Sequence, residues 1–387
     1  MMKLARVTVV GMCMVAGASC QSGEGAAHSA DPVASLEVVP ESETLLPGET
    51  LQLRAAARDR RGRLLADRGF TVVVSNPEVA RVSRTGVVTA TAPGGTRIAV
   101  STEGRTAAMS LTVPPVSAAV AECRVPKPEW IWCDDFEEDR LGAYFEYDSQ
   151  DSFVRTSKVG FGESVGMRAR FDSTGAVNAG SLHVAFGRTP GRYFHPVDAG
   201  TEVYRDVFWR VYVRYEAGWI GGGGNKMSRA QSLATPQFAQ AMIAHVWSGS
   251  SREHPTANYL AIDPASGIGP GGRLTTRSYN DFANLVWLGA AWGKTPLFDD
   301  MHVGKWYCIE AHARLNDPGR ANGLLELWID DRPEARHAGL GWMGRFEEYG
   351  INAVYLENYW NDGAPRAQER YFDNFVISRV RIGCRWR

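Results

Sequence analysis

Residues 225–280 contain side chains of the types that hold an anionic group and move a proton beside it. Lysine and arginine are cationic at neutral pH, whereas histidine and tyrosine can accept or donate a proton. Removing a proton next to a carboxylate needs a cation to neutralise the acid, a base to take the proton and an acid for the leaving group. The catalytic candidates are Lys226, His245, Tyr259 and Tyr279, and the substrate-binding candidates are Arg229, Trp247 and Arg277.

Two of these candidates share one face of a predicted strand. Residues two apart in a strand project from the same face, so in the strand 240–247 His245 and Trp247 are neighbours. A histidine beside an indole fits a sugar-binding groove, and it also fits a half-buried histidine at a sheet edge. The glycine run 221–224 before Lys226 lacks the spacing of a phosphate-binding loop and predicts a hinge or rim loop.

The elements that must position these residues are strands. Residues 126–387 contain short apolar and aromatic runs separated by turns, and convincing helical periodicity is nearly absent. The turn-rich segment 316–323 predicts a hairpin between the strands on either side of it. A long array of antiparallel strands without a repeat predicts a two-sheet jelly roll. The predicted strands span residues 207–214, 240–247, 258–263, 306–315, 324–329, 354–359 and 371–377.

Three segments of this domain carry a family resemblance: residues 306–312 (WYCIEAH), 323–330 (GLLELWID) and 371–376 (YFDNFV). In this order they resemble the concanavalin A-like lectin/glucanase superfamily, and within it the polysaccharide lyase-like jelly rolls of the alginate and glucuronan lyase type. That resemblance implies β-elimination on a uronate polymer by the candidates named above.

Two departures from these families bear on the chemistry. The Glu-x-Asp-x-x-Glu strand of jelly-roll glucanases is absent, which argues against a retaining glycosidase with closely paired carboxylates. The Lys-Leu-Pro-Gly segment of the lyases has its counterpart here in residues 224–229 (GNKMSR).

Acidic residues near the first and last predicted strands of this domain form a second group, Asp134, Asp135, Glu137 and Asp373. The superfamily resemblance implies a structural calcium ion where these strands meet, and carboxylate oxygens are the ligands that calcium prefers. The alternative is an acidic surface at strand ends. We expect no organic cofactor.

Residues 34–113 form a separate β-rich module with turn signals at intervals of about ten residues, a pattern typical of a β-sandwich. Residues 46–50 (LPGET), 75–83 (SNPEVARVS) and 86–90 (GVVTA) resemble the bacterial Ig-like group 2 domain. This resemblance implies a spacer or an adhesive module on a bacterial surface, and the segment contains no evident catalytic group.

The N-terminus has the pattern of an export signal. Lys3 and Arg6 precede an apolar run, residues 7–16, that is too short to span a bilayer, so residues 1–19 are predicted to be a cleaved signal peptide. The small residues before Cys20 resemble a bacterial lipoprotein signal, which implies lipidation of Cys20; the alternative is ordinary cleavage and a soluble secreted product. Residues 20–33 are expected to be a flexible tether.

Four cysteines remain outside the signal, and in an exported chain they favour two disulfides over a metal site. Three pairings are possible. If the first and last strands of the second domain pair antiparallel, Cys123 and Cys384 fall opposite each other, which leaves Cys133 with Cys308. Residues 114–125 are predicted to be a linker between the two domains.

The charge and composition of the chain limit the classes of binding partner. A formal net charge of -1 gives no electrostatic reason to expect nucleic acid. All 12 Trp and all 13 Tyr lie beyond residue 129, so the binding face is expected in the second domain. We therefore predict a bacterial cell-envelope protein, lipid-anchored or secreted, that handles an acidic polysaccharide as a β-eliminating lyase. The alternative is a non-catalytic glycan-binding or adhesive protein, and the oligomeric state is left open.

Overall fold

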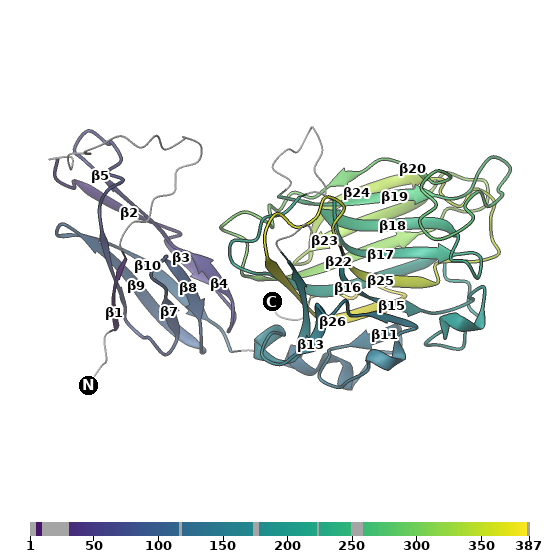
Figure 1. Ribbon diagram of the computed structural model, residues 1–387, viewed down its shortest axis with the longest axis horizontal. Coiled ribbons are helices and arrows are strands. Elements are labelled where there is room, and N and C mark those ends of the chain that lie inside the picture. The colour runs from purple at the N-terminus through teal and green to yellow at the C-terminus, as the bar shows by residue number, and fades with distance from the viewer. Residues whose placement is uncertain are drawn as a thin grey trace. The chain divides into compact units, whose positions relative to one another are not determined.

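The chain forms two compact units, Met1–Val116 and Ser117–Arg387, each built from strands (Figure 1). The computed structural model describes residues 5–9, 31–115, 118–172, 178–222, 224–248 and 258–384. Among these residues the only helices are short 3-10 turns of up to seven residues, so the predicted all-β fold class is confirmed. No helix in the described ranges is long and apolar enough to cross a membrane.

The first unit contains three small sheets whose inward side chains form its core. β6 illustrates why these segments are strands: Phe70, Val72 and Val74 are buried, and the residues between them are partly exposed. The strand orders are β1-β6-β9-β10-β3, β2-β5 and β4-β8-β7. The bounds are β1 Ala5–Val9, β2 Ser35–Val39, β3 Ser42–Thr44, β4 Thr50–Gln52, β5 Arg54–Arg58, β6 Phe70–Val74, β7 Ala80–Val82, β8 Val87–Ala90, β9 Gly94–Thr102 and β10 Arg105–Val113.

β1 belongs to the segment predicted to be the signal peptide, and it pairs antiparallel with β6. Export with cleavage would remove this strand and leave β6 at the edge of its sheet. Cys20 and the rest of residues 20–30 of the predicted tether lie outside the described residues.

The second unit consists of two large antiparallel sheets, which we call the front sheet and the back sheet. The front sheet has the order β12-β15-β25-β17-β18-β19-β20, with β21 also paired to β19. Its bounds are β12 Glu146–Asp148, β15 Asn178–Ala185, β25 Ala353–Tyr359, β17 Asn225–Leu233, β18 Gln240–Ser248, β19 Leu260–Ser266, β20 Val286–Trp287 and β21 Ala291–Trp292.

The back sheet has the order β13-β14-β26-β16-β22-β23-β24, with β11 also paired to β26. Its bounds are β13 Phe153–Thr156, β14 Gly166–Phe171, β26 Gln368–Ser378, β16 Asp206–Tyr215, β22 Trp306–Arg314, β23 Gly323–Ile329, β24 Arg332–Leu340 and β11 Trp130–Asp134. The predicted hairpin is the β22–β23 pair, and every predicted strand of this domain matches an observed one to within a few residues.

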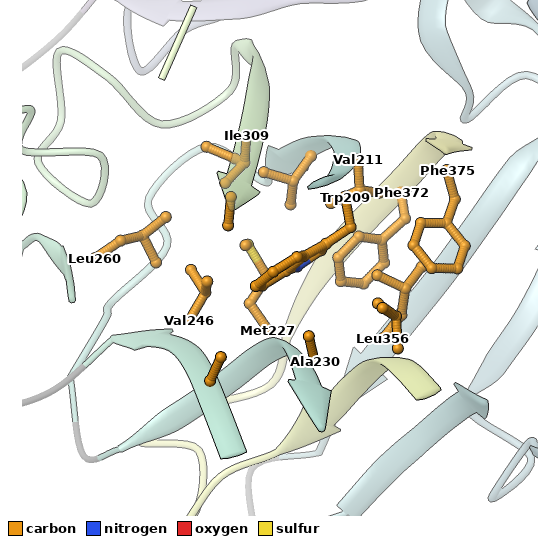
Figure 2. Packing of buried hydrophobic residues seen from close by; sticks show 14 of the residues in the cluster. Trp209, Val211, Met227, Ala230, Val246, Leu260, Ile309, Leu356, Phe372 and Phe375 are labelled. Carbon is orange, nitrogen blue, oxygen red and sulfur yellow. The ribbon is translucent and has the colours of Figure 1, made fainter. Parts of the chain in front are cut away.

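The core of the second unit lies between the two sheets. Trp209 and Ile309 of the back sheet point toward Met227, Val246 and Leu356 of the front sheet (Figure 2). In each front-sheet strand, alternate side chains therefore point into this core, and the side chains between them point to the other face of the sheet. That other face carries the candidate site.

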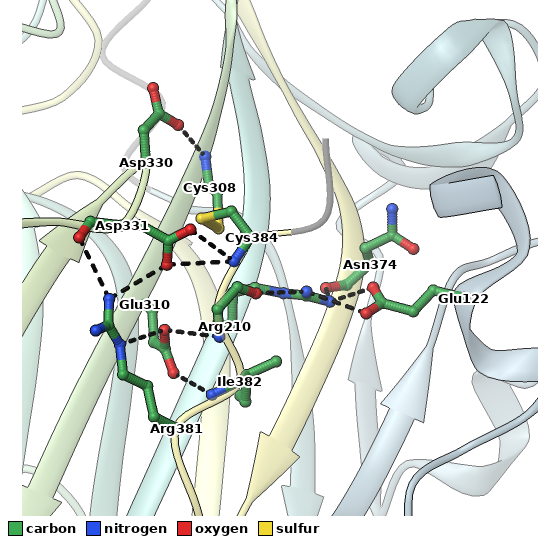
Figure 3. The surroundings of a disulfide bond; sticks show 11 residues. Glu122, Arg210, Cys308, Glu310, Asp330, Asp331, Asn374, Arg381, Ile382 and Cys384 are labelled. Carbon is green, nitrogen blue, oxygen red and sulfur yellow. Dashed lines mark hydrogen bonds and ion pairs between the residues drawn. A yellow bond between two sulfur atoms is a disulfide. The ribbon is translucent and has the colours of Figure 1, made fainter. Parts of the chain in front are cut away.

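The outer face of the back sheet is covered by two short segments, each held by a disulfide. η1 (Ala118–Arg124) is tied by Cys123–Cys133, and the segment after β26 is tied to β22 by Cys308–Cys384 (Figure 3). Beneath them, the fully buried guanidinium of Arg210 pairs with Glu122 of η1. Residues 118–124, predicted to be linker, are thus part of the second unit.

The predicted pairing of Cys123 with Cys384 and of Cys133 with Cys308 is wrong. β11 and β26 do pair antiparallel, as assumed, but neither Cys123 nor Cys384 lies on those strands. The chain before β11 folds back beside Cys133, and the chain after β26 folds back beside Cys308, where the Cys384 N–H is accepted by Asp331 at 3.2 Å.

The two disulfides should contribute unequally to stability. Cys308–Cys384 closes 76 residues and Cys123–Cys133 closes 10. On loop-closure entropy alone, Cys384→Ser should lower the free energy of unfolding of the second unit by about 4 kcal/mol, and Cys123→Ser by about 3 kcal/mol. Chemical denaturation of the full chain under oxidising conditions measures both. A larger loss from Cys123→Ser would show that holding η1 over Arg210 outweighs loop length.

Candidate functional site

A continuous row of polar side chains crosses the outer face of the front sheet. Residues directly opposite each other in antiparallel strands share a face and lie about 5 Å apart. The residues flanking the row, including Leu182, Leu356 and Ile262, point into the core, so the row faces away from it. In strand order from β12 to β19 the row is Glu146, His183, Tyr355, Arg229, His245 and Asp263.

A groove of about 400 Å³ lies over one half of this face, within the range of ligand sites. Its floor is formed by β12, β15, β25 and β17, and residues 279–282 contribute one wall. The lining residues are Glu146, Asp148, Asn178, Gly180, Ser181, His183, Lys226, Tyr279, Asn280, Phe282, Glu357, Asn358, Tyr359 and Asn361.

Lys226 supplies the groove's positive charge. Its side chain is 5% exposed, and among the described residues its ammonium has no hydrogen-bond or ion-pair partner; Nζ lies 4.7 Å from the centre of the Tyr359 ring. Burial lowers the pKa of Lys226, Glu357 acts in the opposite direction, and Arg229 lowers it further. A largely buried side chain whose charge has no partner is costly, and an anionic ligand in the groove would offset that cost.

A β-bulge in β17 brings Lys226 and Arg229 to the same face. Residues three apart in a regular strand point to opposite faces. The register of β17 against β18 shifts between Lys226 and Ser228, and both Met227 and Ser228 point inward; the Ser228 hydroxyl accepts the Trp209 indole N–H at 3.0 Å.

Arg229 organises the centre of the row. Its fully buried guanidinium forms an ion pair with Glu357 Oε1 at 2.8 Å, donates to Asn280 Oδ1 at 2.9 Å and donates to the Tyr279 hydroxyl. These contacts hold residues 279–280 against the sheet. The second carboxylate oxygen of Glu357 is buried and has no partner among the described residues, so it can accept a hydrogen bond from a ligand.

His183 and Glu146 form a histidine–carboxylate pair that opens into the groove. His183 Nδ1 lies 2.7 Å from Glu146 Oε2, and the other oxygen of Glu146 accepts the Tyr193 hydroxyl at 2.8 Å. The imidazole stacks on the Tyr355 ring with 3.5 Å between centroids. A proton held on Nδ1 by Glu146 leaves the Nε2 lone pair available, the arrangement of an oriented general base.

His245 lies on the same face but outside the groove lining. It is fully buried, with ring centroids 5.1 Å from Trp247 and 5.5 Å from Trp287, and neither ring nitrogen has a partner among the described residues. Burial lowers the pKa of His245 far below its usual value, and the charges of Arg229 and Lys226 add to that effect. Burial also raises the pKa of Asp263, which is opposite His245, to about 7.

The structure brings some of the predicted site residues together and separates others. Lys226 and Tyr279 line the groove, and Arg229 contacts Tyr279 from beneath; Trp247 is opposite Lys226 on β18. Tyr259 and Arg277 are not part of the lining. Tyr259 directly precedes β19 and is half-buried, whereas Arg277 is exposed and its backbone N–H donates to Asp281 at 2.9 Å.

Several residues of the site were not among the sequence-based candidates, including Glu146, His183, Tyr355 and Glu357. A usable signal existed for two of them, because Tyr355, Glu357 and Tyr359 alternate along a strand that was predicted. Glu146 and His183 lie on β12 and β15, which were not predicted, so their pairing could not be inferred.

The four carboxylates predicted to bind calcium accept hydrogen bonds in the structure. Asp134 accepts the Tyr144 hydroxyl at 2.9 Å, and buried Asp373 accepts the Phe161 N–H at 2.6 Å. Asp135 and Glu137 accept backbone N–H groups of other segments. Within the described ranges, no three His, Cys, Asp or Glu side chains gather to hold a metal ion. Burial raises the pKa of Asp134 to about 6 and that of Asp373 well above its usual value.

Residues 32–113 match the family described as Bacterial Ig-like domain (group 2). Residues 32–113 are a bacterial Ig-like domain. This confirms the resemblance found in its sequence, and together with two disulfides it fits an exported protein. No curated protein sequence matches the chain.

Several solved structures similar to the chain are polysaccharide lyases. An endo-β-1,4-glucuronan lyase from the fungus Trichoderma reesei is 10% identical, with 65% of this chain and 96% of that chain covered and a TM-score of 0.44. An alginate lyase from a Chlorella virus is 12% identical, with coverage of 62% and 94% and a TM-score of 0.43. An alginate lyase from Aplysia kurodai is 11% identical, with coverage of 64% and 98% and a TM-score of 0.43.

The pair His245 and Asp263 should give two opposing contributions to stability between pH 7 and pH 5. His245 stays neutral in the folded state, whereas its unfolded form takes up a proton below pH 6.5, so acidification destabilises the fold through this group. Asp263 contributes in the opposite direction. Because its pKa is raised in the folded state, the folded protein binds this proton more tightly than the unfolded chain, and acidification stabilises the fold through this group.

His245→Gln should therefore gain stability relative to wild type as the pH falls below 6.5, by about 1.4 kcal/mol per pH unit while the native imidazole stays neutral. Asp263→Asn should lose stability relative to wild type over the same range. Urea denaturation of the full chain at several pH values measures both slopes. The exposed control His195→Asn should follow wild type, and parallel curves for all four proteins would contradict the assignment.

Proposed function

We propose that the second unit binds a uronate-containing polysaccharide in the groove and cleaves it by β-elimination. The observation that carries this proposal is the ammonium of the largely buried Lys226, unpaired among the described residues, in the same groove as the His183–Glu146 pair and the Tyr279 hydroxyl. A cation, an oriented base and a proton donor are the three groups that the reaction needs.

Each group has one role in the proposed reaction. Lys226 binds the uronate carboxylate and stabilises the charge that develops on it when the adjacent carbon loses its proton. His183 Nε2 takes that proton, and Glu146 stabilises the resulting imidazolium. The electron pair of the broken C–H bond forms the carbon–carbon double bond, and the neighbouring glycosidic C–O bond breaks.

Tyr279 is suited to protonate the departing oxygen. Burial of its hydroxyl raises the pKa of Tyr279, although Arg229 acts in the opposite direction, so the phenol keeps its proton at neutral pH. A phenol that is protonated at rest serves as the acid of the reaction. The products are one chain with a new reducing end and one with an unsaturated uronate at its non-reducing end.

The N-terminal part of the chain suits a function at the cell envelope. We infer that residues 1–19 direct export, that Cys20 is lipidated, and that the Ig-like domain acts as a spacer that carries the second unit away from the membrane. The sequence pattern before Cys20 and the two disulfides support this inference.

Removing the cation or the base should abolish cleavage. Lys226→Met and His183→Gln should each lower kcat/KM by about 10²- to 10⁴-fold, because each deletes a group that acts in the transition state. The measurement is the ultraviolet absorbance of the unsaturated product with alginate, polyglucuronate or hyaluronan as substrate. Circular dichroism and thermal unfolding confirm that the variants fold.

Two comparisons make this experiment decisive. Lys294→Met, at an exposed position outside the groove, should keep wild-type activity. His245→Gln distinguishes the two histidines: activity within several-fold of wild type supports His183 as the base, whereas a loss as large as that of His183→Gln assigns the role to His245. Retention of polymer without unsaturated product from any substrate would make the protein a glycan-binding module.

A further inference from the structure

The charges in the groove are unevenly distributed. Three carboxylates line it, Glu146, Asp148 and Glu357, against one cation, Lys226. Arg229 beneath the floor adds a second positive charge, which its ion pair with Glu357 offsets. A groove that bound a uniformly anionic polymer through electrostatic complementarity would carry an excess of cations along its length, and this one does not.

Two of the three carboxylates lie on the far side of the groove floor from the strand that carries the cation. Lys226 lies on β17, Glu357 lies beside it on β25, and Glu146 and Asp148 lie on β12 beyond β15. Three strand spacings put the backbones of β17 and β12 about 14 Å apart, and the Lys226 side chain shortens that span because its Nζ lies over the Tyr359 ring of β25. The anionic end also carries an amide, because Asn178 lines the groove there and donates to Asp148 Oδ2 at 3.2 Å.

Two polar groups without partners mark both the cation and the groove floor as ligand contacts. The Lys226 side chain is 5% exposed without a partner among the described residues, and Glu357, also 5% exposed, has one oxygen without one. The Lys226 ammonium needs an anion, and the Glu357 oxygen needs a hydrogen-bond donor. They are close in the groove, so the ligand must present a carboxylate beside a hydroxyl or amide donor.

We propose that the substrate is a heteropolymer in which a uronate alternates with a sugar that carries no negative charge. The uronate binds at Lys226, and the uncharged or amine-bearing neighbour lies over Asp148 and Asn178, where its hydroxyl, amide or ammonium groups donate to the carboxylate. This inference rests on the proposed function and names the substrate class for the same groove.

A polyuronate would meet repulsion at the Asp148 end. Consecutive uronates place a carboxylate on every ring, so a chain anchored at Lys226 brings another carboxylate toward Asp148 and Glu146. Like charges brought together at a binding surface disfavour the wrong partner. Both carboxylates accept hydrogen bonds, Asp148 from Gln150 and Asn178 and Glu146 from His183 and Tyr193, and both keep their charge toward the groove. Because Glu146 also belongs to the proposed base pair, Asp148 is the residue whose charge tests this preference.

The test compares polymers of the two classes on the full-length protein. Hyaluronan provides alternating uronate and N-acetylated sugar, its partly de-N-acetylated form provides an amine-bearing neighbour, and alginate and polyglucuronate provide consecutive uronates. Dissociation constants and rates of unsaturated product formation are measured for each. Wild type should favour the alternating polymers by about tenfold or more, and a further gain with the de-N-acetylated form would identify the neighbour as cationic.

Asp148→Asn should reduce the preference for alternating polymers to about twofold. The substitution removes the charge and keeps the shape of the side chain, so alginate and polyglucuronate should be bound more tightly and cleaved faster than by wild type. Asp151→Asn is the matched control: Asp151 is exposed, three residues further on and outside the lining, and its change should leave the preference intact. Equal or better use of alginate or polyglucuronate by wild type, or no response to Asp148→Asn, overturns the inference while leaving β-elimination in place.

If the protein binds these polymers without cleaving them, the ratio of dissociation constants still tests the inference, and only the proposed catalysis fails. If none of the four polymers is retained or cleaved, both proposals are overturned.

Discussion

The architecture of the groove depends on the burial of Arg229. A guanidinium that is fully removed from water must have its charge compensated, and here Glu357, Asn280 and the Tyr279 hydroxyl provide that compensation. The same contacts fix the carboxylate on the groove floor and hold residues 279–280 as a wall. Truncating Arg229 would therefore leave Glu357 buried without its counter-ion and release the wall formed by residues 279–280. The charge on the groove floor, the shape of the groove and the position of the Tyr279 phenol thus all depend on this one side chain.

Much of the fold could be predicted from local patterns. The strands of the second unit that alternate clearly, such as β16, β22 and β23, were predicted nearly to the residue because a two-residue period needs no tertiary information. The Ig-like unit was recognisable from its ordered turn motifs, which the family match confirms. β12 and β15 were missed because one is three residues long and the other begins with Asn-Ala-Gly, and neither shows the period before its neighbours are known.

The site was predicted in part for the same reason. Lys226 and Arg229 lie three residues apart, and the fold brings Tyr279, which is 50 residues from Arg229, to the same groove. The pairing of Glu146 with His183 arises from β12 lying beside β15, and Glu357 reaches Arg229 from a strand more than 120 residues away. Such contacts depend on strand order, which no local pattern contains. The disulfides failed as predictions because both involve a cysteine outside the paired strands, in segments that fold back over the back sheet.

The bulge in β17 has a consequence for how such a groove can arise or disappear. Lys226 faces the groove only because one additional residue is accommodated between it and Arg229. If the strand kept all four residues but ran without the bulge, Lys226 and Arg229 would point to opposite faces, and the lysine would be directed toward the apolar interior, where its charge could not be retained. A shift of one residue in the pairing of this strand, with no substitution at Lys226, would thus separate a groove that contains the lysine from one that does not.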